Sequence, residues 1–115
     1  MSKCLYLATT FSPMMLGEGV SAVVTEINLD TAKRRLGRGF YSAVGHEITA
    51  EILSLLLGRE VEFNRIPVIL NDGDELICIV PNFRANQARE FTREEVEGAG
   101  VRAFYIMAVQ VMAVL

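Results

Sequence analysis

Gly45 and His46 are the residues of this chain whose types and positions best suit chemistry, since they begin an apolar segment predicted to be the main helix (SAVGHEITAEILSLLLG). We expect Ser42 to be its N-cap and Gly58 its left-handed C-terminal stop. His46 then lies near free helix N–H groups, which attract anions, and Gly45 lets a ligand approach the backbone. An imidazole beside a phosphate can protonate a leaving alkoxide. A histidine bonded in the core or at an interface is the structural alternative, and this feature alone slightly favours it.

Arg65 is a second candidate, because Asn64-Arg65 interrupts an otherwise apolar stretch. An arginine fork suits a phosphate. The alternative is a charged residue that points to solvent from an edge strand.

Two loops add polar side chains that could contact a ligand. The loop over 81–91 contains Arg84 and Gln87, and arginine can hold phosphate while an amide can read base edges. The loop after the first predicted strand contains Thr9 and Ser12, whose hydroxyls could bind a ligand or simply form a turn. Loops often carry function, but solvated loops of this composition are common.

Other sites of catalysis have no support in the sequence. Cys4 and Cys78 each lie in an apolar run, so we predict two buried, reduced thiols. One histidine and two separated cysteines do not make a usual metal-ligand cluster, and we expect neither metal nor cofactor. Phosphate-loop, nucleophile-elbow and zinc motifs are missing from the sequence.

Alternating strand and helix patterns predict a single α/β domain of the α+β type over residues 1–115, with helices packed on a mixed five-stranded sheet. We expect a short helix over about 30–36, capped by Asn28 or Asp30, and another over 93–97 that starts with a Thr92/Glu95 capping box. The Asn71–Asp74 turn is expected to join two strands in a hairpin, the first with an edge or bulge at Pro67. The predicted strands are 3–9, 20–27, 61–70, 75–80 and 101–114, the last with a far end that could be helix or tail.

Composition restricts the possible partners. The chain has 115 residues and is 51% hydrophobic, which favours burial of some apolar surface in a homodimer. The main helix is apolar on two sides, and a second copy of it is one simple partner for the outer side. No apolar run approaches the ~20 residues of a membrane span, and the N-terminus does not resemble a signal peptide, so we expect a cytoplasmic protein with no membrane partner. The net charge of −3 argues against binding to long nucleic acid.

Taken together, these segments resemble a known family. The segment FYSAVGHEITAEILSLLLGREVEFNRIPV is similar to the signature of the viral anti-CRISPR ring nucleases of type III defence, in which an S-x-[IV]-G-H-[ED]-x-T helix start precedes a Leu-rich helix, a Gly and an N-R-[IV] strand. YLATTFSPMML resembles the family's first strand and loop, and NFRANQAREFTREEV aligns with its R-L-x-E-G stretch. The resemblance extends to cellular, YddF-like relatives and to an archaeal turreted-virus protein family. It covers nearly the whole chain, and the G-H-E-x-T-A and N-R-I pieces are its specific part.

The resemblance implies a cytoplasmic homodimer, in the host cell if the protein is viral, that binds cyclic tetra-adenylate at the dimer interface and cleaves it without metal. The substrate's 2′-hydroxyl attacks phosphorus, and the histidine, here His46, protonates the 5′-oxygen. It also implies that Arg65 and Arg84 hold phosphate and that Thr9 and Ser12 contact the ligand. A two-fold dimer would place one histidine at each of two opposed phosphates of a four-nucleotide ring, and because attack is intramolecular, orientation would supply much of the rate.

Three positions depart from the family pattern. Gln87 stands where the family has glutamate, Ala88 where it has glycine, and Thr9 where asparagine is common. Glutamine forms hydrogen bonds but takes no proton, so a non-catalytic sponge or sensor of cyclic nucleotides is the second hypothesis. A structural dimer whose apolar helix serves only assembly is the third.

Overall fold

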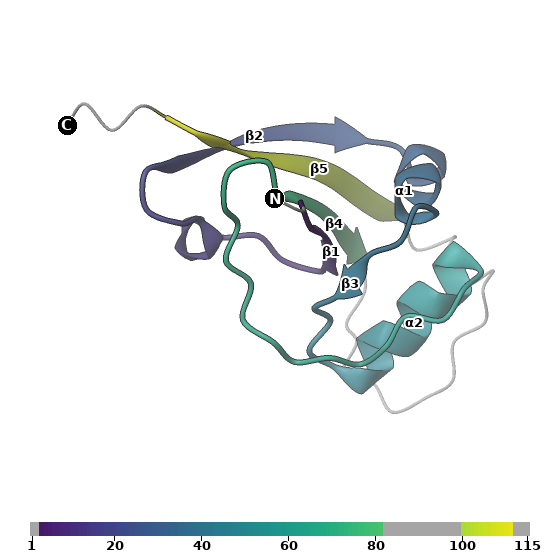
Figure 1. Ribbon diagram of the computed structural model, residues 1–115. Coiled ribbons are helices and arrows are strands. Elements are labelled where there is room, and N and C mark those ends of the chain that lie inside the picture. The colour runs from purple at the N-terminus through teal and green to yellow at the C-terminus, as the bar shows by residue number, and fades with distance from the viewer. Residues whose placement is uncertain (1–2, 82–99, 112–115) are drawn as a thin grey trace.

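The computed structural model describes residues 3–81 and 100–111, which form a mixed five-stranded sheet and two α-helices (Figure 1). The strand order is β2-β5-β4-β1-β3. In chain order the elements are β1 (Leu5–Ala8), the 3-10 helix η1 (Pro13–Met15), β2 (Val20–Ile27), α1 (Leu29–Leu36), β3 (Tyr41–Ser42), α2 (Glu47–Leu57), β4 (Glu75–Pro81) and β5 (Val101–Gln110).

The sheet is parallel on one side and antiparallel on the other. β1 pairs in parallel with both β3 and β4, and β5 pairs antiparallel with both β4 and β2. The carboxyl ends of β1, β3 and β4 therefore lie at one edge of the sheet. The loops that follow these three strands leave from that edge.

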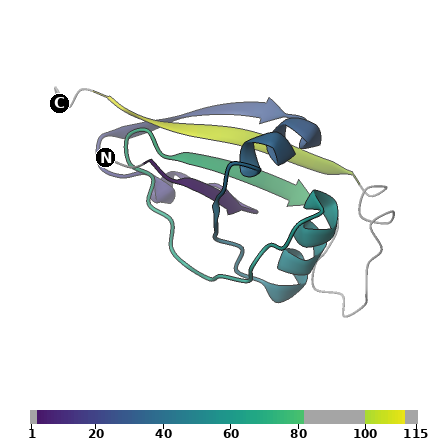
Figure 2. The same ribbon diagram turned by 45° about the vertical axis from the view of Figure 1, so that its right-hand side comes forward.

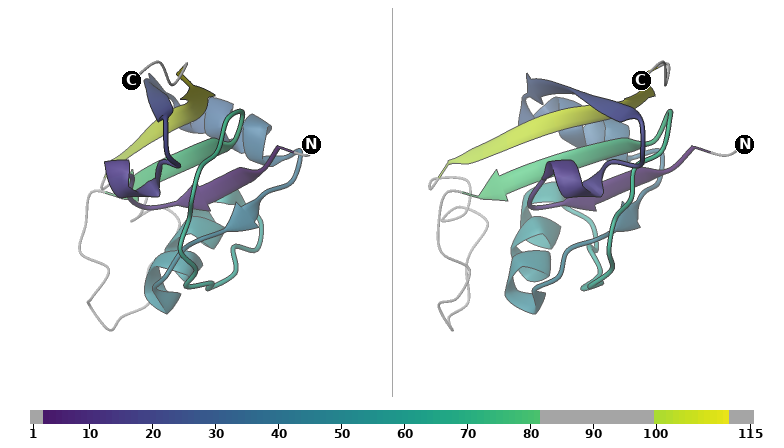
Figure 3. Two further views of the ribbon diagram at one scale, coloured as in Figure 1. Left: turned by 60° about the vertical axis from the view of Figure 1, so that its left-hand side comes forward. Right: turned by 90° about the vertical axis from the view of Figure 1, so that its left-hand side faces the viewer.

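Each face of the sheet has its own apolar cluster, because side chains alternate between the faces along a strand. Leu7, Ile77 and Ala103 pack on the side of α1 and α2, in a cluster that includes Leu36 and Leu53. The opposite cluster is covered by Phe11, Met15 and Leu16 around η1 and by Val68 and Leu70. The right-hand view of Figure 3 shows η1 in front of the sheet and the two α-helices behind it.

Local signals place α1 and the end of α2 where the sequence predicts them. Asn28 caps α1, and its Oδ1 accepts a hydrogen bond from the Thr31 N–H at 2.8 Å. α2 stops at Gly58, whose φ of 64° is left-handed. β2 has its predicted bounds, whereas β1, β4 and β5 differ from theirs by a few residues at the ends.

The predicted strand over 61–70 is wrong. The segment runs as an extended loop below the sheet (Figure 2), and its β-bridges are the isolated ones Val44–Phe63 and Leu16–Leu70 rather than a continuous ladder. Pro67 has no N–H for a ladder, and β4 already pairs with β1 and β5. The Asn71–Asp74 turn therefore does not form a hairpin, and the fifth strand of the sheet is the short β3.

The main helix also begins later than predicted. Ser42 belongs to β3, and His46 rather than Ser42 is the N-cap of α2. The Ala43 N–H donates to the Leu7 carbonyl at 2.8 Å, which continues the sheet past Ser42 before the helix starts. The apolar side chains of α2 are largely covered within the chain itself, with Leu55 38% exposed, so α2 does not present the wide apolar outer side that we expected a second copy to cover.

The helix expected over 93–97 and residues 112–114 of the last predicted strand lie outside the described residues. Within the described part of the chain, no helix is both long and apolar enough to cross a bilayer.

Candidate functional site

The candidate site lies at the carboxyl edge of the parallel strands. β1 leads into Thr9, β3 leads into Ala43 to His46, and β4 ends at Pro81. In sheets with parallel strands, ligands commonly bind just outside this edge. The fold therefore places several predicted site segments side by side, although they are far apart in the sequence.

His46 is at the boundary between β3 and α2. Its backbone is extended (φ −134°, ψ 130°), and its side chain makes no capping hydrogen bond to the helix. The residue is exposed, and its carbonyl accepts the first helical bond, from the Ala50 N–H at 3.0 Å. The imidazole is thus outside the core, at the positive end of an eleven-residue helix. This arrangement contradicts the alternative of a histidine bonded in the core.

Arg65 lies directly beside Gly45. A Cβ added at Gly45 would lie 3.4 Å from the Cγ of Arg65, so the stem of the arginine lies alongside the backbone that precedes His46. Arg65 is exposed. The structure therefore places Arg65 beside the residue that precedes His46 and the N-terminus of α2. An arginine, an imidazole and a helix N-terminus are groups that can hold and protonate a phosphate ester.

Ser42 and Asn64 fix this arrangement. The Ser42 hydroxyl donates to the Glu62 carbonyl at 2.6 Å, and the Asn64 side-chain amide donates to the Ser42 carbonyl at 2.8 Å. The Asn64 N–H also donates to the Val44 carbonyl at 2.9 Å. These bonds attach the segment before Arg65 to the chain before His46. Sequence reasoning missed this role, since it treated Ser42 as a helix cap and Asn64 only as the neighbour of Arg65.

Thr9 and Ser12 follow β1 but have different surroundings. Thr9 is partly exposed at the end of the strand, next to the edge described above. Ser12 caps η1, and its Oγ accepts a hydrogen bond from the Met14 N–H at 3.1 Å. Ser12 thus performs the turn role that we gave as its alternative, whereas Thr9 remains available to a ligand.

Arg84 and Gln87 lie outside the described residues. β4 brings the chain to the same edge as Thr9 and Gly45 before residue 82. The predicted contacts of Arg84 and Gln87 with a ligand stay predictions.

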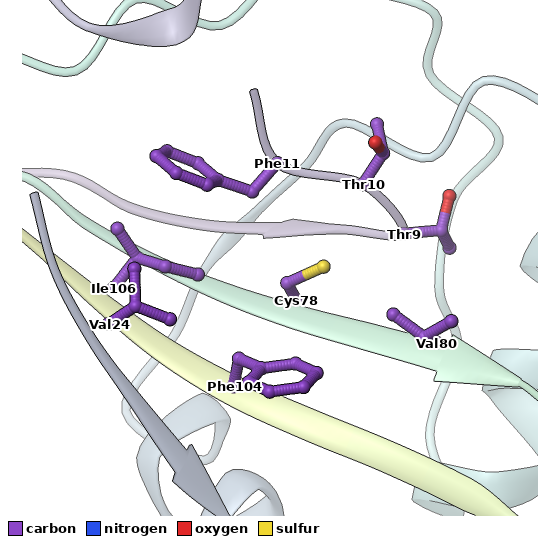
Figure 4. A pocket seen from close by; sticks show the side chains of 8 residues that line it. All are labelled: Thr9, Thr10, Phe11, Val24, Cys78, Val80, Phe104 and Ile106. Atoms are coloured by element: carbon purple, nitrogen blue, oxygen red, sulfur yellow. The ribbon is translucent and has the colours of Figure 1, made fainter. Parts of the chain in front are cut away.

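An open pocket of about 410 Å³ adjoins Thr9 on the sheet face opposite the two α-helices (Figure 4). Its lining includes Thr9, Thr10, Phe11, Cys78, Val80 and Phe104. Sequence reasoning missed this pocket, although strand alternation does place Cys78 and Phe104 on one face.

The two cysteines differ in burial, and Cys78 is not a candidate for nucleophilic chemistry. Both are free, Cys78 is buried and Cys4 is partly buried, so the prediction of buried reduced thiols is confirmed fully only for Cys78. Burial raises the pKa of the Cys78 thiol to about 11, and the thiol is therefore protonated at neutral pH. Among residues 3–81 and 100–111, no group of three or more His, Cys, Asp or Glu side chains is arranged to hold a metal ion.

Sequence comparison matches residues 5–103 to the family described as STIV B116-like. The chain belongs to this family. A protein of Acidianus two-tailed virus, described as uncharacterized protein ORF117, is 34% identical over 113 residues, covering 95% of this chain and 97% of the relative. Uncharacterized protein 26 of a Sulfolobus islandicus filamentous virus is 36% identical over 90 residues, covering 76% of each chain. These relatives of the B116-like chain are proteins of archaeal viruses.

The B116-like fold is also found in a solved structure. Protein B116 of Sulfolobus turreted icosahedral virus superposes with a TM-score of 0.78 at 21% identity, covering 90% of this chain and 98% of that one. The single α+β domain with its mixed sheet and two helices is therefore the B116 fold, as the resemblance to an archaeal turreted-virus family led us to expect. The identity is low enough that this likeness concerns the fold alone.

Proposed function

We propose that this B116-like protein is a ring nuclease that binds cyclic oligoadenylate, most readily cyclic tetra-adenylate, and cleaves it without a metal ion to switch off type III CRISPR signalling. The observation that carries the proposal is the position of Arg65 against Gly45, directly before the exposed His46 at the N-terminus of α2. The G-H-E and N-R-I pieces of the resemblance meet at this point of the fold.

The proposed reaction uses the ligand's own nucleophile. A 2′-hydroxyl attacks the adjacent phosphorus and forms the 2′-oxygen–phosphorus bond, while the bond from phosphorus to the 5′-oxygen breaks. The hydroxyl proton passes to solvent, and protonated His46 gives its proton to the 5′-oxygen. The products are linear, with a 2′,3′-cyclic phosphate and a 5′-hydroxyl. Arg65 and the N–H groups at the start of α2 hold the charged phosphate in line.

The protein acts as a homodimer in this proposal. Each chain contains one histidine, so two chains related by a two-fold axis offer one imidazole to each of two opposed phosphates. Exposed apolar side chains on the pocket side of the sheet, such as Val24 and Val80, favour cover by another chain there rather than at α2.

Incubation with labelled cyclic tri-, tetra- and hexa-adenylate, with and without EDTA, tests the activity. We expect loss of the tetra-adenylate ring at the same rate in both buffers. His46→Ala should abolish cleavage and leave binding largely intact, since the imidazole forms no capping bond that folding needs. Equal cleavage by wild type and His46→Ala would remove His46 from the mechanism.

A binding protein without turnover is the second candidate, and Gln87 at the family's glutamate position favours it. Such a sponge or sensor would bind a cyclic oligoadenylate tightly and yield no product after long incubation. Failure of every ring to shift the melting temperature would contradict both candidates and favour a structural role.

A further inference from the structure

The pocket beside Thr9 is built from one row of residues across the sheet. Ala8 on β1 pairs with Cys78 on β4, and Cys78 pairs with Phe104 on β5. Side chains opposite each other in neighbouring strands are close enough to touch, so Cys78 and Phe104 make a continuous floor. Figure 4 shows the Phe104 ring beside Cys78, with Phe11, Thr10 and Thr9 across the pocket.

The chemistry of the lining is that of a site for a flat, mostly apolar group with polar edges. Cys78 and Val80 are apolar, Phe104 and Phe11 are aromatic, and only the threonines offer hydroxyls. Ligand sites typically combine an apolar lining with a few polar groups and have volumes of roughly 300–1,000 Å³. The ~410 Å³ here falls within that range.

Phe104 has a charged neighbour on the same face of β5, because side chains two residues apart on a strand share a face. The guanidinium of Arg102 lies 5.1 Å from the centre of the Phe104 ring, and Glu26 binds Arg102 through two hydrogen bonds of 2.9 and 3.0 Å. The arginine thus lies beside the aromatic ring at the rim of the pocket, where its positive charge adds to the attraction for an electron-rich ligand.

The pocket and the candidate phosphate site lie at the same edge of the sheet. Thr9 directly follows β1, which lies between β4 on the pocket side and β3, the strand that leads to Gly45. Neighbouring strands are about 4.8 Å apart, so the pocket and the Gly45–Arg65 contact are a few strand spacings from each other. A ring of several nucleotides can span this distance, with a base in the pocket and a phosphate beside Arg65.

We propose that this pocket binds one planar nucleobase of the ligand whose phosphate lies at Arg65 and His46, with Phe104 as the stacking surface and the Thr9 and Thr10 hydroxyls at the base edge. The inference rests on the proposed function, which supplies an adenine base on each nucleotide of the ring. Bases commonly stack on aromatic side chains when a protein binds single-stranded nucleotides.

Methyl NMR of the full chain, using His46→Ala to prevent turnover, tests this inference directly. Adenosine 5′-monophosphate and cyclic tetra-adenylate are each added as probes. A stacked purine should shift the methyl signals of Val24 and Val80 through its ring current. Val23 is the internal control, because it is the chain neighbour of Val24 on the opposite face of β2 and does not line the pocket.

Phe104→Leu removes the ring and keeps an apolar side chain of similar size. We expect it to weaken binding of cyclic tetra-adenylate by about tenfold, the scale of one lost base stack. Phe40→Leu is the matched control, since Phe40 also lies under a guanidinium (Arg59, 4.9 Å) but packs in the cluster on the helix side. Phe40→Leu should bind the ring as the parent does.

The outcomes separate this inference from the proposed function. If cyclic tetra-adenylate binds, but the Val24 and Val80 methyls stay in place and Phe104→Leu binds normally, the base pocket is wrong and the nuclease proposal stands. If adenosine monophosphate shifts these methyls while no cyclic ring binds, the pocket is supported as a nucleotide site and the nuclease proposal fails. Shifts of equal size at Val23 and Val24, or no binding of either probe, would overturn the inference.

Discussion

The side-chain amide of Asn64 donates a hydrogen bond to the backbone carbonyl of Ser42 at 2.8 Å, across 22 residues of sequence. This contact joins the segment before Arg65 to the segment before His46. The geometry of the candidate site therefore depends on a residue that need not touch the ligand. Asn64 is a positioning residue, and its effect is on where Arg65 lies.

Asn64→Ala should reduce ring cleavage by at least tenfold, because misplacing a phosphate-holding group by about 1 Å can cost ~10²-fold in rate. Loss of the hydrogen bond should lower the free energy of unfolding by only about 1 kcal/mol. Cleavage assays and urea unfolding measure the two effects.

Asn28→Ala is the matched control for that variant. Asn28 also uses its side chain for a 2.8 Å hydrogen bond to backbone, with Thr31 at the start of α1. Its loss should cost a similar ~1 kcal/mol in stability with unchanged cleavage. Equal losses of cleavage in the two variants would mean that Asn64 acts through stability alone.

Gly45→Ala tests the close packing of Arg65 on the backbone. The added Cβ would lie 3.4 Å from the Arg65 Cγ, in van der Waals contact, and would fill the space through which a phosphate can approach the backbone beside the arginine. We expect severalfold weaker ring binding in calorimetry with little change in melting temperature. Gly37→Ala is the control, since its Cβ would meet the Arg34 carbonyl at 3.3 Å, away from the site. Normal ring binding by Gly45→Ala would show that the contact does not orient Arg65 for phosphate.

Sequence patterns predicted the elements whose signals are local. Three of these predictions are confirmed: the Asn28 cap, the helix end at Gly58 and the strand β2. Each depends only on residues close to it in the sequence. The prediction of a strand over 61–70 was wrong because apolar, β-branched residues also suit a loop that covers a sheet face. Its state depends on β4 pairing with β1, which no local pattern reveals.

The residue types single out the candidate residues but not their supports. Taken alone, His46 and Arg65 leave a core histidine and a solvent-facing arginine as alternatives, and their contacts with a ligand stay predictions. The Ser42–Asn64 bond and the Cys78–Phe104 pair join distant parts of the chain, and their partners follow only from strand order and register. Ser12 has the local role that was its stated alternative, because its hydroxyl oxygen caps a 3-10 helix, and its contact with a ligand stays a prediction.

Cys78 should resist alkylation that modifies Cys4. Burial raises the Cys78 pKa from the usual 9.0 to about 11, so its thiolate, the reactive form, is scarce at pH 8. Iodoacetamide treatment of the native protein followed by peptide mass spectrometry should find Cys4 modified first. Rapid modification of Cys78 at pH 8 would mean that the thiol is neither buried nor raised in pKa.

The raised pKa of Cys78 also makes the free energy of unfolding depend on pH. The folded protein holds the Cys78 proton more tightly than the unfolded chain does, so this stabilisation is complete below about pH 9 and is lost as the pH rises towards 11. Cys78→Ser has no thiol to titrate. The difference in unfolding free energy between wild type and Cys78→Ser should therefore narrow between pH 9 and 11, as measured by urea titration. A constant difference across this range would contradict the raised pKa.

Asp74 should be the more important of two aspartates in one turn. Its buried carboxylate accepts hydrogen bonds from the Cys4 N–H at 3.0 Å and the Asn71 N–H at 2.9 Å, which fix the turn beside the start of β1. Asp74→Asn replaces one accepting oxygen with a donor that faces a backbone N–H, and we expect a loss of about 1–3 kcal/mol in unfolding free energy.

Asp72→Asn is the control for that variant. The exposed Asp72 side chain accepts one bond from the Gln110 N–H, so its loss should lower the unfolding free energy by less than about 1 kcal/mol. Urea unfolding of both variants gives the comparison, and equal costs would show that the link to Cys4 contributes nothing to stability. Ring binding should be normal in both, because the turn precedes β4 at the sheet edge opposite His46.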